Sequence, residues 1–569
     1  MKVFTSLRRG IVALFLALLI SPALASQPEK PPLAVNLAPV RDWSTQQPFL
    51  DVMKTARRWI GHRPGQWGGA SYDEINAMGI LDDRGWPRAI PRELGSIGTV
   101  ILTDMPQEAM SLAGQYVLRF QGDGIVEVAG RARNVRYRGN EVRFDFTPGP
   151  GPVEIRIQRT DPGKTGDYVR NISVVRASRL AEFEAGAIFD PDWLAQLEGF
   201  EVLRFMDWMN TNDSDQRLWS NRPQETDFSY SRRGVPIEVM LELANVLGAS
   251  AWVNMPHLAD DDYVARFAML VKQGLAPEMQ IYVEYSNEVW NWQFLQAEWA
   301  DAMGRELWGA TYLGAQYYGM RAAEIARLWS GVYASQAEER LVNVISTQTG
   351  WLGLEADILT APRMKSERGD AYQPPYDAFD AYAITGYFGH VLGTDKRVDL
   401  VNAWIVESLA VASADAAAAG LTGAAFDEYV GRHRFDLASE RAFEELLNGQ
   451  HSGDTQDTLQ DLRDRVFPYH SEVAARYDLD LIMYEGGTHV VGIGAAVDNA
   501  DFTAFFTTFN YSDQMGKLYD MVMQDWADAG GNLFNIFADV QAADKWGSWG
   551  ALRYRDDANP RWDAIERWK

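Results

Sequence analysis

Two glutamates, each at the end of a predicted β-strand, have the residue types and surroundings for acid–base chemistry. The first, Glu288, lies in the stretch Gln280–Trp292, which begins as a strand of β-branched and aromatic residues and ends in Asn287, Glu288 and two tryptophans. An amide can hydrogen-bond a sugar hydroxyl, a carboxylic acid can protonate a glycosidic oxygen, and indole faces can stack on a pyranose. The stretch therefore predicts chemistry on a carbohydrate.

The second acid, Glu485, ends the apolar strand predicted at Asp480–Glu485 and is followed by two glycines, which let substrate or backbone approach closely. Two carboxylic acids that face one another across a cleft are the minimum equipment for glycoside hydrolysis. The Asn–Glu pair alone is a weak signal, because Asn140–Glu141 repeats it in a stretch that reads as structural. The positions of the two acids in the fold must therefore carry the argument.

The two acids are positioned by a succession of strands with helices between them. Buried parallel strands read as apolar runs, and eight βα units that close on themselves form a (β/α)₈ TIM barrel. Glu288 then ends strand four and Glu485 ends strand seven, on opposite sides of one pocket; an open doubly wound sheet is the alternative fold. The predicted strands lie at residues 33–37, 201–208, 251–257, 280–285, 341–346, 381–388, 480–485 and 532–537.

Two insertions interrupt this α/β pattern. Short alternating strands separated by Gly/Pro/Asp-rich turns over residues 90–178 predict an inserted antiparallel β-sandwich domain. A long helical insertion at about residues 399–477 precedes strand seven. The barrel would then comprise residues 26–89, including a helix at 49–60, and residues 179–569.

The first residues, 1–25, predict a secretory signal peptide. Lys2, Arg8 and Arg9 precede an unbroken apolar run, and Ala23-Leu24-Ala25 matches a cleavage site. The run is too short to span a bilayer, which disfavours the alternative of a membrane anchor, and no later stretch reads as a membrane span. We therefore expect an exported protein, periplasmic or extracellular, that begins near Ser26 after cleavage near Ala25.

Composition excludes several classes of function. The formal net charge of −25 disfavours nucleic acid and anionic membranes as partners, because both require clustered Lys and Arg. The absence of cysteine excludes thiol catalysis, cysteine metal sites and disulfides. The seven histidines lack paired metal spacing, and neither a G-x-S-x-G elbow nor a complete dinucleotide fingerprint occurs, so we expect no metal and no cofactor.

The two strand-end glutamates resemble those of clan A of the glycoside hydrolases, a group of retaining (β/α)₈ enzymes, although no family within the clan can be assigned. The resemblance implies that Glu288 is the acid/base, Glu485 the nucleophile and Asn287 a ligand of the sugar 2-hydroxyl. It also matches Arg204, on strand two, to an arginine beside the nucleophile. An aromatic residue or histidine near the end of strand six would be Tyr387, with His390 beside it.

The resemblance further implies a polar residue on strand three, which is His257 or Asn254 here. Many clan members carry a tryptophan at the end of strand eight, where this chain has Phe537, so Trp546 or Trp549 would supply the missing platform. Tryptophans on or just after the predicted strands are candidate sugar platforms. They are Trp43, Trp208, Trp290, Trp292, Trp351, Trp546 and Trp549.

Electrostatics supports a division of roles between the two acids. An arginine near Glu485 would lower its pKa and keep it an anion, and aromatic neighbours would raise the pKa of Glu288. Glu284 would point into the barrel as a buried partner of Arg204 or of another basic group, rather than as a catalytic residue. The sequence thus predicts an exported retaining β-glycosidase acting on an oligo- or polysaccharide. The alternatives are an inverting enzyme and a non-catalytic carbohydrate-binding or structural envelope protein on a degenerate barrel.

Overall fold

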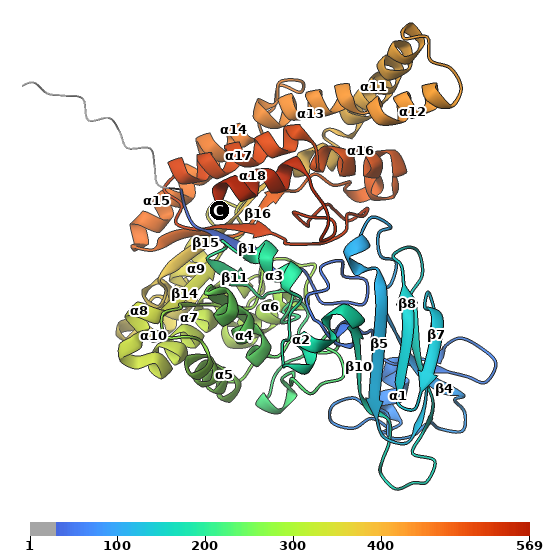
Figure 1. The fold of residues 1–569 in the computed structure, drawn as a ribbon. Coiled ribbons are helices and arrows are strands. Elements are labelled where there is room, and N and C mark those ends of the chain that lie inside the picture. Colours follow the sequence, from blue (N-terminus) through green and yellow to red (C-terminus); the bar gives the residue numbers. More distant parts are fainter. Residues whose placement is uncertain (1–29) are drawn as a thin grey trace, which may run out of the picture.

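The structure, a computed structural model, describes residues 30–569. Its centre is a closed barrel of eight parallel strands, one at each of the eight segments predicted from the sequence (Figure 1). The (β/α)₈ prediction is confirmed, and the predicted signal peptide lies outside the described residues. The barrel strands are β1 (Leu33–Asn36), β11 (Val202–Arg204), β12 (Ser250–Met255), β13 (Ile281–Tyr285), β14 (Leu341–Ser346), β15 (Ala381–Phe388), β16 (Asp480–Thr488) and β17 (Phe534–Phe537).

Helices surround the barrel and bury their apolar faces against the strands. Asp260 caps one of them, accepting a hydrogen bond from the backbone amide of Tyr263 at 2.8 Å. The longer barrel helices are α3 (Pro191–Leu197), α4 (Ile237–Leu247), α5 (Asp261–Gly274), α6 (Leu295–Trp308), α7 (Gly314–Tyr333), α9 (Leu354–Thr360), α10 (Pro362–Arg368), α15 (Phe467–Tyr477), α16 (Ala500–Asn510), α17 (Asp513–Asp528) and α18 (Pro560–Trp568).

An antiparallel β-sandwich lies beside the barrel (Figure 1). Apolar residues from its two sheets form a second hydrophobic core, separate from that of the barrel. The predicted sandwich is thus present, and two of its strands, β2 and β3, precede residue 90. One sheet contains β10 (Arg170–Arg176), β5 (Gly114–Gln121), β8 (Glu141–Phe146) and β7 (Arg133–Arg138); the other contains β3 (Gly69–Ala70), β2 (Ile60–His62), β4 (Ser96–Ile101), β9 (Val153–Thr160) and β6 (Gly124–Gly130).

The predicted helix at residues 49–60 is wrong. The segment holds one 3₁₀ turn, Val52–Thr55, and then enters β2. The Asp51 carboxylate accepts hydrogen bonds from the amides of Met53 and Val174, which ties the segment to β10. Tertiary contacts with the sandwich therefore override the local helical pattern.

The helical insertion lies between β15 and α15, and two of its helices project away from the barrel (Figure 1). By length and composition α11 could span a membrane, with 28% of its most apolar window buried, so the prediction that no later stretch is apolar enough is wrong for this helix. Glu407 of α11 pairs with Arg441 of α13 at 2.6 Å. The insertion contains α11 (Val398–Ala418), α12 (Ala424–His433), α13 (Asp436–Asn448) and α14 (Leu459–Asp461).

Candidate active site

Glu485 lies near the end of β16 and is almost completely buried, with 5% of the residue exposed. Its Oε1 accepts a hydrogen bond from Nη1 of Arg204 at 2.9 Å, and its Oε2 accepts one from the Tyr387 hydroxyl at 3.0 Å. These donors come from β11 and β15. Three barrel strands therefore fix the orientation of this carboxylate.

Arg204 is fully buried inside the barrel and is shared between two carboxylates. Its Nη2 donates to Glu284 at 3.0 Å and to the side-chain oxygen of Asn287 at 2.9 Å. The predicted pairing of Glu284 with Arg204 is thus confirmed. Glu284 also accepts hydrogen bonds from Trp252, Asn254 and Ser346.

The pKa of Glu485 departs from the expectation. Burial raises it to about 8, and the negative charge of Glu288 contributes in the same direction. Arg204 and the Tyr387 hydroxyl act against this rise without reversing it. The predicted lowering is wrong because the single positive charge of Arg204 is shared with Glu284, while desolvation acts on Glu485 in full.

Glu288 lies in the turn after β13 and is partly exposed, with a positive φ of 42°. The Tyr484 hydroxyl donates to its Oε1 at 3.0 Å, and the Asn291 amide donates to its Oε2 at 2.9 Å. The left-handed backbone of Glu288 is strained because the residue is not glycine, and such strain concentrates at functional sites. The donors to Glu288 differ from those to Glu485, so each acid has its own set of hydrogen bonds.

Tyr484 and Glu485 are consecutive, yet each contributes to the site. The register between β15 and β16 shifts at this point, with Thr385 opposite Glu485 and Tyr484 left unpaired. Such a bulge turns a side chain out of strict alternation. It explains how the Tyr484 hydroxyl reaches Glu288 while the next residue bonds Arg204.

Both glutamates line one open cavity of about 740 Å³. Asn287, Tyr387, His390 and Trp549 line it too, and Arg204 lies beneath it. The helical insertion contributes residues 456–466 in part, so the insertion forms one wall. Tyr387, His489, Phe537 and Trp549 form an aromatic cluster with ring centroids 5.1–6.2 Å apart.

Several predicted site residues lie elsewhere. Trp208 is 0% exposed in the barrel core, stacked on Trp193, so it offers no surface to a sugar. His257 is 6% exposed and lines no part of the cavity, and burial lowers its pKa to about 4. Trp290 packs its ring edge-on to that of Tyr484 and does not line the cavity.

Asn254, the other candidate on strand three, and Trp546, in the loop after strand eight, also lie outside the cavity. Asn254 is buried and donates to Glu284 and to the backbone oxygen of Ser286. Trp546 is 62% exposed outside the cavity, whereas Trp549 of the same loop enters it. Glu141, which belongs to the second Asn–Glu pair of the sequence, forms ion pairs with Arg119 and Arg143 on the sandwich, as expected for a structural residue.

Sequence reasoning missed Tyr484, Asn291 and His489. The position of Tyr484 results from a β-bulge, which the residue types of the strand do not predict. His489 is buried, and both burial and the neighbouring His390 lower its pKa, to about 3. Asn291 follows Glu288 by three residues, the spacing at which one turn brings two side chains together, and this signal was available. The fold and these residues define a (β/α)₈-barrel protein with two glutamates in one open cavity.

No family model and no curated protein matches this chain. Among solved structures it resembles the cellulose synthase subunit Z of Clostridioides difficile (9% identity, 67% of this chain and 94% of that chain, TM-score 0.32). It also resembles fungal β-1,4-galactanases (12%, 69% and 97%, 0.32) and a β-glucosidase of Trichoderma harzianum (12%, 66% and 86%, 0.35). The likeness to glycoside hydrolases concerns the fold, assigns no family and gives no residue a role.

Proposed function

We propose that this protein is an exported retaining β-glycosidase that cleaves an oligo- or polysaccharide. The observation that carries the proposal is the pair Glu288 and Glu485, which line one cavity and are each held by two protein donors. Two acids in one cavity match the requirement of glycoside hydrolysis for one proton donor and one nucleophile or base.

In the proposed mechanism Glu485 attacks the anomeric carbon and forms a glycosyl–enzyme intermediate. Glu288 gives its proton to the departing glycosidic oxygen and then takes one from the water that hydrolyses the intermediate. Both oxygens of Glu485 already accept hydrogen bonds, one of them from a guanidinium, which orients the carboxylate and stabilises its anionic form. Glu288 is the more accessible acid, as a group that meets both leaving group and water must be.

The experiment compares Glu485→Gln with Glu288→Gln on aryl β-glycosides. Glu485→Gln should abolish turnover of every substrate. Glu288→Gln should lose about 10²–10⁴-fold on poor leaving groups, the range for general acid catalysis, and much less on a dinitrophenolate, which departs without a proton. Full activity in either variant would refute the assignment.

Stereochemistry separates this mechanism from the alternatives. NMR of the first product should show retained anomeric configuration. A 2-fluoro glycoside with a good leaving group should lose that group and add the mass of its 2-fluoroglycosyl unit to the peptide containing Glu485. An inverted product would make Glu485 a base. Oligosaccharide binding with no product from a polysaccharide panel would favour a non-catalytic binding protein.

Export is part of the proposal and rests on the leader sequence alone. The mass and N-terminal sequence of the protein recovered from the periplasm or medium should begin near Ser26. An uncleaved N-terminus in the cytoplasmic fraction would refute export and leave the chemistry unaffected.

A further inference from the structure

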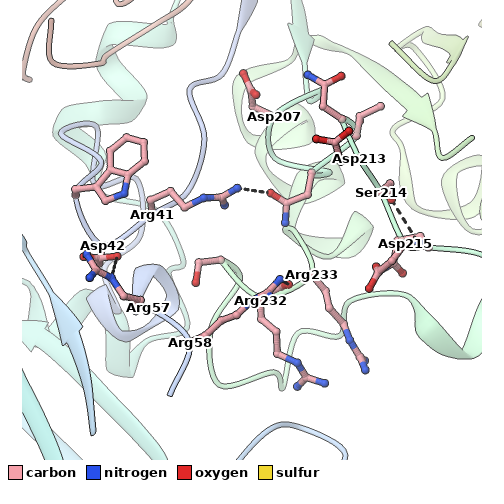
Figure 2. A pocket seen from close by; sticks show the side chains of 16 residues that line it. Arg41, Asp42, Arg57, Arg58, Asp207, Asp213, Ser214, Asp215, Arg232 and Arg233 are labelled. Carbon is pink, nitrogen blue, oxygen red and sulfur yellow. Dashed lines mark hydrogen bonds and ion pairs between the residues drawn. The ribbon is translucent and has the colours of Figure 1, made fainter. Parts of the chain in front are cut away.

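A second cavity of about 580 Å³ lies beside the cavity that contains the two glutamates, and Figure 2 shows the side chains that line the second cavity. Asp207 and Asn212 line both cavities, so the two are neighbours. The Nδ2 group of Asn287 donates to Asn212 at 3.2 Å, which links the shared wall to the residue beside Glu288. A chain-like substrate that occupies the first cavity can therefore extend into the second.

The second cavity is rich in guanidinium groups, in a chain whose formal net charge is −25. Five arginines line it, and only Arg57 forms an ion pair within residues 30–569, with Asp42 at 2.7 Å. The other four bond only neutral protein groups or none. They are Arg41, Arg58, Arg232 and Arg233.

These unpaired guanidinium groups lie close enough to repel one another. Arg232 and Arg233 extend side by side from one loop (Figure 2), and the charge of Arg232 lowers the pKa of Arg233, as burial does. Burial lowers the pKa of Arg41 as well, and the charge of Arg58 adds to this effect. Asp207 and Asp42 attract Arg41, and Asp227 and Asp215 attract Arg233, so this repulsion is partly offset. None of these aspartates forms an ion pair with either arginine within residues 30–569, and a bound anion in direct contact would offset the repulsion further.

The aspartates of this cavity do not fill that role. Asp42 is taken by Arg57, and Asp207 accepts a hydrogen bond from Asn36 while burial raises its pKa. Asp213 accepts a hydrogen bond from the backbone amide of Leu295, and Asp215 accepts one from the side-chain amide of Gln216 at 3.0 Å. The carboxylates of this cavity thus accept hydrogen bonds from other protein groups, whereas the guanidinium groups retain N–H donors that a ligand could use.

We propose that the second cavity is a subsite that binds a sugar unit bearing an oxyanion, a carboxylate or a sulfate, so that the substrate is an acidic β-linked glycan. Guanidinium groups bind both oxyanions through paired N–H donors. Trp43, 44% exposed on the cavity wall, offers an indole face to the pyranose. The inference rests on the proposed glycosidase function for the substrate class, whereas the anion site rests on the arginines alone.

Binding is tested by calorimetry on the full chain carrying Glu485→Gln, which prevents turnover. The probes are β-1,4-mannuronate oligomers for the carboxylate, carrageenan oligosaccharides for the sulfate and cello-oligosaccharides as neutral reference. At least one acidic probe should bind more tightly than the neutral one, and more weakly as NaCl is raised. Replacing Arg58 and Arg233 by Gln should weaken that binding at least about tenfold, since charge-assisted hydrogen bonds are lost.

Arg327→Gln is the matched control, because Arg327 is half-buried on α7 and lines neither cavity. It should leave the affinity unchanged. Failure of both acidic probes to bind better than the neutral one, or equal weakening by the control, would overturn the inference. Which acidic probe binds assigns the oxyanion.

Kinetics distinguishes failure of this inference from failure of the proposed function. For an acidic polymer that is cleaved, the ratio of kcat/KM between that polymer and its carboxyl-reduced or desulfated form should fall about tenfold or more in the Arg58/Arg233 variant. Glu485-dependent cleavage with an unchanged ratio would overturn the subsite and keep the glycosidase. Arginine-dependent binding of acidic oligomers without any cleavage would keep the subsite and overturn the glycosidase function.

Discussion

Two tyrosines provide a test of which glutamate is the nucleophile. The Tyr387 hydroxyl donates to Glu485 and the Tyr484 hydroxyl donates to Glu288, both at 3.0 Å. Tyr484 is buried, and Tyr387 is partly buried within the aromatic cluster. Replacing either by Phe removes one hydrogen bond and little volume. The two variants are therefore matched, and each perturbs a different acid.

The size of the Tyr387→Phe effect follows from the pKa of Glu485, which is about 8. A hydrogen bond to a charged group contributes about 1.5–3 kcal/mol, so its loss should raise that pKa by about one unit or more. At pH 7 the anionic fraction would then fall from about a tenth to about a hundredth, and kcat/KM would fall about tenfold. The acid limb of the pH profile should move to higher pH.

Tyr484→Phe should act on the other acid. It removes one of the two hydrogen bonds that orient the Glu288 carboxyl, so kcat/KM should fall for poor leaving groups and much less for a dinitrophenyl glycoside, which departs without a proton. The assay is kcat/KM against pH for wild type and both variants, with limbs assigned to the pair because the two acids interact. An alkaline-limb shift in Tyr387→Phe would exchange the two roles, and an unchanged pH profile in that variant would refute the reasoning.

Three further outcomes are expected. Trp549→Ala should raise KM about tenfold through loss of an aromatic contact, and Trp546→Ala should leave it unchanged, as steady-state kinetics will show. Arg204→Leu should destabilise the fold by about 3–5 kcal/mol in urea denaturation by leaving Glu284 uncompensated, and adding Glu284→Leu should restore part of this. Burial raises the pKa of Asp539 to about 6, so its contribution to stability is full below its unfolded pKa near 4 and is lost as pH rises through 6. The decline in Tm from pH 4 to 8 should therefore be shallower in Asp539→Asn than in wild type, and an equal slope would contradict this.

The barrel could be read from the sequence because its signals are local. Apolar runs such as 341–346 and 381–388 are strands wherever they occur, and their order with intervening helices leaves few topologies. The segment 49–60 failed because the Asp51 carboxylate is recruited by the sandwich, a partner more than a hundred residues away.

The sequence by itself determined the eight-stranded barrel, the two strand-end glutamates and the inward direction of Glu284, since strand periodicity decides which side chains point inward. Only the tertiary structure decided that Trp549 enters the cavity while Trp546 stays outside, that a bulge delivers Tyr484 to Glu288, and that burial outweighs Arg204 at Glu485. It also brought together arginines from two distant stretches of the chain. Each of these features depends on distances between segments that are remote in sequence, and such distances cannot be predicted from the residue types alone.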